Sequence, residues 1–226
     1  MLRRFVFRNL GLAWLLFAAL QASLAGQPRP TSGHALQVGP VVMTVSDMDR
    51  SVAFYTGVLT FERVSDRKHS GPEFDQLYGI IHTHVRLVDL KLGDESIELL
   101  QFIGAAGAPV PADARSNDLS FQHVAIIVSD MARAYSVLRQ NHVQHISVYP
   151  QTLPEWNPSA AGIKAFYFQD PDGHPLEVLQ FPAGKGDPKW QHANGKLFLG
   201  IDHGDRCLQH RREPGVLRHA AGHARG

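Results

Sequence analysis

The sequence predicts an α+β protein built from two successive βαβββ modules, and two observations support this. The first is an internal repeat. Val41–Met48 resembles Val124–Met131 at an offset of 83 residues, and Glu98–Phe102 matches Glu177–Phe181 at an offset of 79. The second is that both copies have the same order of strand-like and helix-like segments between these ends. Similar segments at nearly one offset, in one order, are typical of duplicated supersecondary units.

The elements of the first copy follow from local patterns. The apolar, β-branched run Val41–Val45 is typical of a buried strand. Ser46-Asp47 then offers a helix N-cap, and apolar residues at helical spacing predict a helix over 50–59. Three strand-like stretches follow, at 61–65, 85–92 and 96–103, with a turn at 92–94 between the last two. The first module therefore spans 36–103.

The second copy repeats this order. Its first strand is predicted at 124–128 and its helix at 132–140. Three strands are predicted at 144–149, 163–169 and 175–181, with the turn Asp170-Pro171-Asp172-Gly173 between the last two. The second module spans 119–182, and residues 104–118 form the linker.

Composition excludes several classes of protein. The 226 residues are 44% hydrophobic and 19% charged, which is ordinary for a globular protein. Residues 26–203 hold 14 basic and 19 acidic residues, so this part has no electrostatic reason to bind nucleic acid. The single cysteine, Cys207, lies in the basic C-terminal segment, which excludes disulfides and cysteine metal sites from the modules.

The first 25 residues are typical of an export signal. Arg3, Arg4 and Arg8 precede an apolar run, Leu10–Leu20, and Ser23-Leu24-Ala25 is a suitable cleavage site. The apolar run is shorter than the ~20 residues that a membrane-spanning helix needs. The expected mature protein is periplasmic or secreted, has no membrane segment after cleavage and begins with a loose leader at 26–35.

Two motifs in the modules resemble a known family. The segment 45–55, Val-Ser-Asp-Met-Asp-Arg-Ser-Val-Ala-Phe-Tyr, and the segment 170–178, Asp-Pro-Asp-Gly-His-Pro-Leu-Glu-Val, resemble the vicinal oxygen chelate superfamily. This superfamily includes glyoxalases, bleomycin-resistance proteins and extradiol dioxygenases. The resemblance covers about 36–182 and implies that the two modules form an eight-stranded, pseudo-twofold cup of the glyoxalase type.

The resemblance also implies a divalent metal in the cup. Its ligands would be a histidine in the first strand and a glutamate in the last strand of each module. Carried over, these positions hold Glu98 in the first module and His123 and Glu177 in the second, whereas Pro40 replaces the fourth ligand. The substitutes weighed for Pro40 are His34, His82 and His84, although nothing in the sequence directs these side chains into a cup.

The chemistry of such a set can be stated from the residues themselves. Equivalent positions on equivalent strands would bring Glu98 and Glu177 to one axis. Two carboxylates and an imidazole suit Fe, Mn, Ni, Co or Zn, with other positions open to water and substrate. The metal would polarise substrate oxygens, and either glutamate could act as the catalytic base. In the absence of the repeat, His123 would be an ordinary core histidine and the glutamates ordinary strand residues.

Three functions are consistent with these observations. The first is a metal-dependent enzyme, a lyase, isomerase or ring-cleaving dioxygenase, acting on a small oxygen-rich substrate. The second is a metal-free protein that binds a small molecule, like bleomycin-resistance proteins. The third is an inactive fragment of a longer multi-module enzyme. A homodimer is compatible with all of them.

The C-terminal segment suggests a third module. Leu197–His203 resembles the opening strand of a module, and the linker before it begins at 183. Residues 204–226 then fit neither a strand nor an amphipathic helix. Read one nucleotide later, residues 204–217 can encode a segment ending in Ser-Leu-Ala-Phe-Tyr, similar to Ser51–Tyr55. The expectation is a disordered tail produced by a frameshift.

Overall fold

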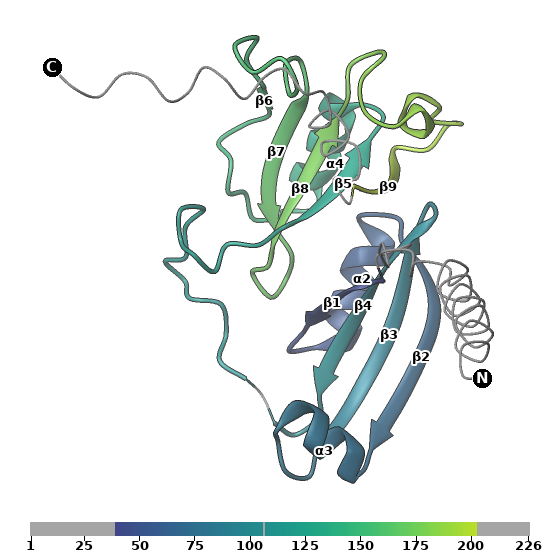
Figure 1. The fold of residues 1–226 in the computed structure, drawn as a ribbon, viewed down its shortest axis with the longest axis vertical. Helices are drawn as coiled ribbons and strands as arrows, with labels where there is room; N and C mark the ends of the chain where they lie inside the picture. Colours follow the sequence, from purple (N-terminus) through teal and green to yellow (C-terminus); the bar gives the residue numbers. More distant parts are fainter. Residues whose placement is uncertain (1–38, 106, 203–226) are drawn as a thin grey trace, which may run out of the picture. The chain divides into compact units, whose positions relative to one another are not determined.

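A computed structural model describes residues 39–105 and 107–202, which contain two βαβββ modules and a further strand (Figure 1). The elements of module 1 are β1 (Val41–Thr44), α2 (Met48–Gly57), β2 (Glu62–Ser70), α3 (Pro72–Tyr78), β3 (His84–Leu92) and β4 (Glu95–Phe102). Those of module 2 are β5 (Val124–Val128), α4 (Met131–Gln140), β6 (Gln151–Thr152), β7 (Lys164–Gln169) and β8 (Pro175–Gln180). A 3-10 helix, η1 (Pro188–Gln191), and β9 (Phe198–Asp202) follow. Within these two ranges, no helix has the length and apolar character needed to cross a membrane.

The two modules share one sheet topology. Module 1 has the strand order β1-β4-β3-β2, and module 2 has β6-β7-β8-β5 with β9 added beside β5. In each module the first strand lies parallel to the last, and the last two strands form an antiparallel hairpin. The α+β class is therefore confirmed.

The predicted helices are present and begin at the expected caps. The Asp47 side chain accepts a hydrogen bond from the backbone N–H of Arg50 at 3.0 Å, and Asp130 does the same for Arg133 at 3.0 Å. These bonds satisfy N–H groups that lack a partner in the first turn of a helix. The caps place the starts of α2 and α4 at Met48 and Met131, slightly before the predicted starts.

Among the described residues, each module contributes four strands, as predicted, and the sheet of module 2 has a fifth strand. This fifth strand lies within 197–203, where the sequence predicted the opening strand of a third module. The additional strand is β9, which lies antiparallel to β5. Its backbone pairs with an edge of β5 that would otherwise carry unpaired N–H and C=O groups.

The strand predicted at 144–149 is wrong in its bounds. Only His145 forms a bridge there, to Phe168, and the short β6 follows it. The backbone N–H groups of Ile146 and Ser147 both donate to the carbonyl of Tyr167, and the Ser147 hydroxyl accepts from the Tyr167 N–H. A side chain thus takes a bond that a regular ladder would make, which interrupts the strand.

The short helix α3 was not predicted from the sequence. Pro72 occupies its first turn and Gly79, in the left-handed region, ends it. Phe74 and Tyr78, four residues apart, pack with Phe102 over the small buried cluster of Val85, Leu87 and Leu100.

Several predictions concern residues beyond the described ranges. These are the export signal at 1–25, the leader at 26–35, the candidate ligand His34, and the C-terminal segment from His203 onward.

One hydrophobic cluster joins the two modules. It contains buried side chains from α2 and β4 of module 1, from β5, α4 and β7 of module 2, and from β9. Tyr55 is 1% exposed and Phe166 is fully buried. The two modules therefore share a core. Neither module buries all of its apolar side chains with its own residues alone.

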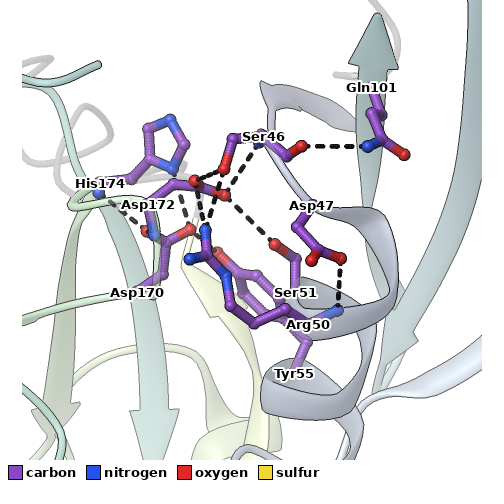
Figure 2. A network of polar contacts seen from close by, with 9 residues as sticks. All are labelled: Ser46, Asp47, Arg50, Ser51, Tyr55, Gln101, Asp170, Asp172 and His174. Carbon is purple, nitrogen blue, oxygen red and sulfur yellow. Dashed lines mark hydrogen bonds and ion pairs between the residues drawn. The ribbon is translucent and has the colours of Figure 1, made fainter. Parts of the chain in front are cut away.

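A polar network lies beside this core, where the β7–β8 turn contacts α2 (Figure 2). Asp170 accepts bonds from the backbone N–H groups of Asp172 and His174, both at 2.9 Å, from the Tyr55 hydroxyl at 3.1 Å, and lies 2.9 Å from His174 Nδ1. Asp172 in turn accepts from the Ser46 hydroxyl and from Arg50 Nη2, which lies 2.6 Å away. The turn thus fixes module 2 to the first turn of α2.

This network predicts a pH-dependent stability. The hydrogen bond to Asp170, followed by the charges of Asp170 and Asp172, raises the pKa of His174. Since the folded state binds this proton more tightly than the unfolded state, the contribution of His174 is complete below the unfolded pKa of about 6.5 and is lost as pH rises through the folded pKa. The stability difference between the wild type and His174→Gln should therefore be largest near pH ~5.5 and fall by roughly 1 kcal/mol by pH ~9. Urea unfolding across this pH range measures it, and an unchanged difference would contradict the assignment.

The β3–β4 turn of module 1 contacts β9. Glu95 Oε2 accepts a bond from the Ile201 N–H at 3.4 Å, and Glu95 forms an ion pair with Lys189. Gly93 has a φ of 64°, and a Cβ on it would collide with the backbone carbonyl of Leu199. Glycine at this position therefore allows the turn to approach β9.

Gly93→Ala should destabilise the protein by about 2–3 kcal/mol, because it adds a collision with backbone to the strain of a positive φ. Gly79 is a matched control: it has a φ of 67° with nothing within 4 Å of its Cβ position. Gly79→Ala should cost only the strain, about 1 kcal/mol. Urea unfolding of both variants compares them, and equal losses would show that the contact with β9 contributes nothing.

Candidate functional site

The predicted site residues occupy equivalent positions in the two modules. Glu98 in β4 is paired with Val42 on the first strand, and Glu177 in β8 is paired with Ala125. His123 lies one residue before β5, and Pro40 lies one residue before β1. The structure therefore supports the alignment on which the ligand prediction depends.

In module 2, His123 and Glu177 lie together. His123 Nε2 is 3.3 Å from Glu177 Oε2, and the Glu177 side chain is 8% exposed whereas that of His123 is 35% exposed. A buried carboxylate against one ring nitrogen fixes the orientation of the imidazole ring.

Tyr167 completes this group. It is the cross-strand neighbour of Glu177, and its ring packs edge-on against His123 with a centroid separation of 5.1 Å. Burial, the charge of Glu177 and a hydrogen bond to Glu177 raise the pKa of Tyr167 to about 12. The phenol is therefore protonated at physiological pH and can act as a hydrogen-bond donor.

In module 1, Glu98 has different neighbours. Arg67 Nη2 lies 2.8 Å from Asp89 Oδ2 and 3.4 Å from Glu98 Oε2, and the Ser65 hydroxyl donates to Asp89. Burial, followed by the charge of Asp89 and a hydrogen bond with it, raises the pKa of Glu98. A carboxyl group shifted in this direction holds a proton more readily than a free glutamate.

The predicted metal ligands do not form one set. Glu98 does not join His123 and Glu177, and residues 39–105 and 107–202 contain no group of three or more histidine, cysteine, aspartate or glutamate side chains that could hold a metal ion. The proposed substitutes His82 and His84 therefore do not complete the set either. Catalytic zinc, for comparison, takes three protein ligands. The donors present thus fit a divalent metal poorly, because His123 and Glu177 supply only two.

Two hollows on the surface of the described residues lie elsewhere. One is lined by linker residues 110–112, by 141–144 and by the turn at 169–173, and another by residues around Gly57, Gly93 and Gly195. Neither is lined by Glu98, His123 or Glu177.

Comparison with known proteins settles the family. The model of the Glyoxalase/Bleomycin resistance protein/Dioxygenase superfamily matches residues 37–178. The chain belongs to this superfamily. Members of the superfamily bind small-molecule substrates, commonly use divalent metals and often form dimers.

Two similar proteins are informative. A protein of Actinomyces sp. described as a 2-epi-5-epi-valiolone epimerase is 30% identical over 156 residues, which cover 66% of this chain and 82% of that protein. The crystal structure of a glyoxalase family protein from Bacillus cereus matches with a TM-score of 0.57 and 16% identity, covering 67% of this chain and 98% of that one. The second likeness concerns the fold alone.

Three residues of the site, Arg67, Asp89 and Tyr167, were not predicted from the sequence. Asp89 and Tyr167 are the cross-strand partners of the two glutamates, so the hairpin turns at 92–94 and 170–173 could have located them. Arg67 could not have been found in this way, because β2 continues beyond its predicted end at 65 and carries Arg67 in the extension.

Proposed function

We propose that the protein is an isomerase that epimerises a small, oxygen-rich carbonyl compound by moving a proton at the carbon next to the carbonyl group. The observation that carries the proposal is the His123–Glu177 pair with Tyr167 beside it. The name of the relative from Actinomyces sp. favours an epimerase over the lyase and dioxygenase alternatives.

Module 2 supplies the base in this proposal. His123 is the more exposed partner and takes the proton from the substrate carbon. Glu177 is a positioning residue that holds the imidazole ring and stabilises its positive charge. The Tyr167 hydroxyl donates to Glu177 and helps to hold that carboxylate beside the imidazole ring.

Module 1 supplies the acid. Epimerisation needs a second group that returns a proton to the opposite face of the same carbon. Glu98 suits this role, because its raised pKa favours the protonated form and it occupies the register position equivalent to Glu177. The divalent metal predicted from the sequence has no step in this mechanism, since its ligands are not assembled.

The proposal is tested by deuterium exchange. The protein is incubated with 2-epi-5-epi-valiolone, and with other small keto-polyols, in D₂O, and proton NMR follows the substrate. The expected result is deuterium at the carbon next to the carbonyl group together with the appearance of an epimer. Exchange that is absent with every compound, both with chelator and with added divalent metals, would overturn the proposal.

A metal-free binding protein is the second candidate, and an aromatic cluster in module 1 favours it. The rings of His69, Phe74, Tyr78 and Phe102 contact one another in series, with centroid separations between 5.1 and 6.5 Å. Aromatic side chains in a group give a surface for an aromatic or amphipathic ligand. Saturable ligand binding without exchange would favour this function.

We also propose that the protein is exported. The support is the pattern of residues 1–25, in which three arginines precede a short apolar run and a small-residue cleavage site. Expression of the full chain in a Gram-negative host, followed by N-terminal sequencing, tests it. Mature protein beginning near Gly26 is expected in the periplasm, and an uncleaved cytoplasmic product would contradict export.

A further inference from the structure

The two modules surround their equivalent glutamates with different chemistry. Around Glu177, module 2 has His123 and Tyr167. At the corresponding places around Glu98, module 1 has Pro40 and Asp89. One half of the site therefore offers an imidazole and a phenol, and the other offers a second carboxylate and no ring nitrogen.

Arg67 is the third member of the group in module 1. It lies on β2 opposite Leu87 and shares a sheet face with Asp89, the residue two positions further along β3. Its Nη2 contacts both carboxylates, at 2.8 Å for Asp89 and 3.4 Å for Glu98. Strands β5 to β8 of module 2 contain no arginine, so this cation is specific to module 1.

A guanidinium group at this position opposes metal binding. Arginine carries its positive charge at all physiological pH values, so a divalent cation at Glu98 would face a fixed like charge. Pro40 offers no ligand atom from its side chain. Arg67 thus supplies the positive charge beside Asp89 and Glu98.

The Arg67 guanidinium group can also bind a ligand. The contacts with Asp89 and Glu98 both use Nη2, and the Arg67 side chain is 48% exposed. Guanidinium groups bind carboxylate and other oxyanions through paired N–H donors. An oxygen anion can therefore reach the Nη1 and Nε side of Arg67.

We propose that Arg67 takes the place of a metal cation in module 1 and binds an anionic oxygen of the ligand, a carboxylate or enolate, without any divalent metal. This inference rests on the proposed function for the identity of the ligand as an enolisable carbonyl compound. It assigns to Arg67 the stabilisation of oxygen charge beside the acid Glu98.

The first test measures oxyanion binding without metal. Oxalate, a dianion that resembles an enolate of a keto acid, is titrated calorimetrically into the full chain in the presence of chelator. Arg67→Met should weaken binding by tenfold or more, and Arg67→Lys should retain part of it because the charge remains. Equal binding by wild type and Arg67→Met, both with native circular dichroism, would overturn the inference.

The second test asks where a metal can bind, with Co²⁺ as an optical probe. Glu98→Gln should not change the Co²⁺ affinity of the wild type. The double variant Pro40→His/Arg67→Met removes the like charge and adds an imidazole at the position equivalent to His123. Its Co²⁺ affinity should therefore be at least tenfold higher than that of the wild type. Adding Glu98→Gln to the double variant should abolish this gain. Stoichiometric Co²⁺ binding by the wild type that Glu98→Gln removes would overturn the inference. Neither test uses the exchange reaction, so each can fail while the isomerase activity is present.

Discussion

Replacing Asp170 with alanine is expected to lower the free energy of unfolding by about 3–5 kcal/mol. The Asp170 side chain is fully buried and receives bonds from two backbone N–H groups and the Tyr55 hydroxyl, beside the His174 ring. Alanine would leave these donors without an acceptor in the interior. Because the same turn joins module 2 to α2, the shared core would also loosen.

Asp94→Ala is a matched control for Asp170→Ala. Asp94 lies at the equivalent turn of module 1 and is exposed, so Asp94→Ala should change stability by less than ~0.5 kcal/mol. Asp170→Asn, which keeps one acceptor oxygen for the backbone, should lose roughly half as much as Asp170→Ala. Chemical unfolding of the three variants gives the values. Similar losses for Asp170→Ala and Asp94→Ala would show that the buried network does not hold the turn.

The sequence predicted the fold where its signals were local. The repeat and the Ser-Asp caps predicted the first strands, the helices α2 and α4 and both terminal hairpins. The strand at 144–149 failed because the Ser147 side chain bonds the backbone of Tyr167, an interaction that depends on a partner twenty residues away. The pairing of β9 with β5 was likewise not predictable, since it depends on a free sheet edge.

The candidate site was predicted only in part. The repeat located Glu98 and Glu177 on their strands, whereas His123 lies one residue before β5, and His123 and Glu177 do lie together. The repeat could not show that Arg67 pairs with Glu98, because the two residues are 31 positions apart and lie on strands separated by β3. Pro40, at the position where a histidine ligand was expected, was the indication in the sequence that module 1 lacks a complete ligand set. The structure adds that Arg67 contacts Glu98 there.

Glu177→Gln is expected to reduce the rate of deuterium exchange by about 10²–10³-fold with little change in the substrate concentration that gives half-maximal rate. The amide is nearly the same size as the carboxylate, so the packing of β8 should persist. It loses the negative charge that stabilises protonated His123, whose Nε2 lies 3.3 Å from Glu177. Glu177→Gln should therefore slow the proton-transfer step, whereas the affinity for the substrate should change little.

The same measurement separates the two glutamates. If Glu98 returns the proton on the opposite face, Glu98→Gln should slow epimer formation while exchange at the original configuration continues, because His123 can still remove and replace the proton on its own face. Glu177→Gln should slow both processes together. NMR resolves the two signals in one experiment, with Glu62→Gln, an exposed residue of β2, as the control. Equal slowing of exchange and epimer formation by Glu98→Gln would contradict the division of roles between the modules.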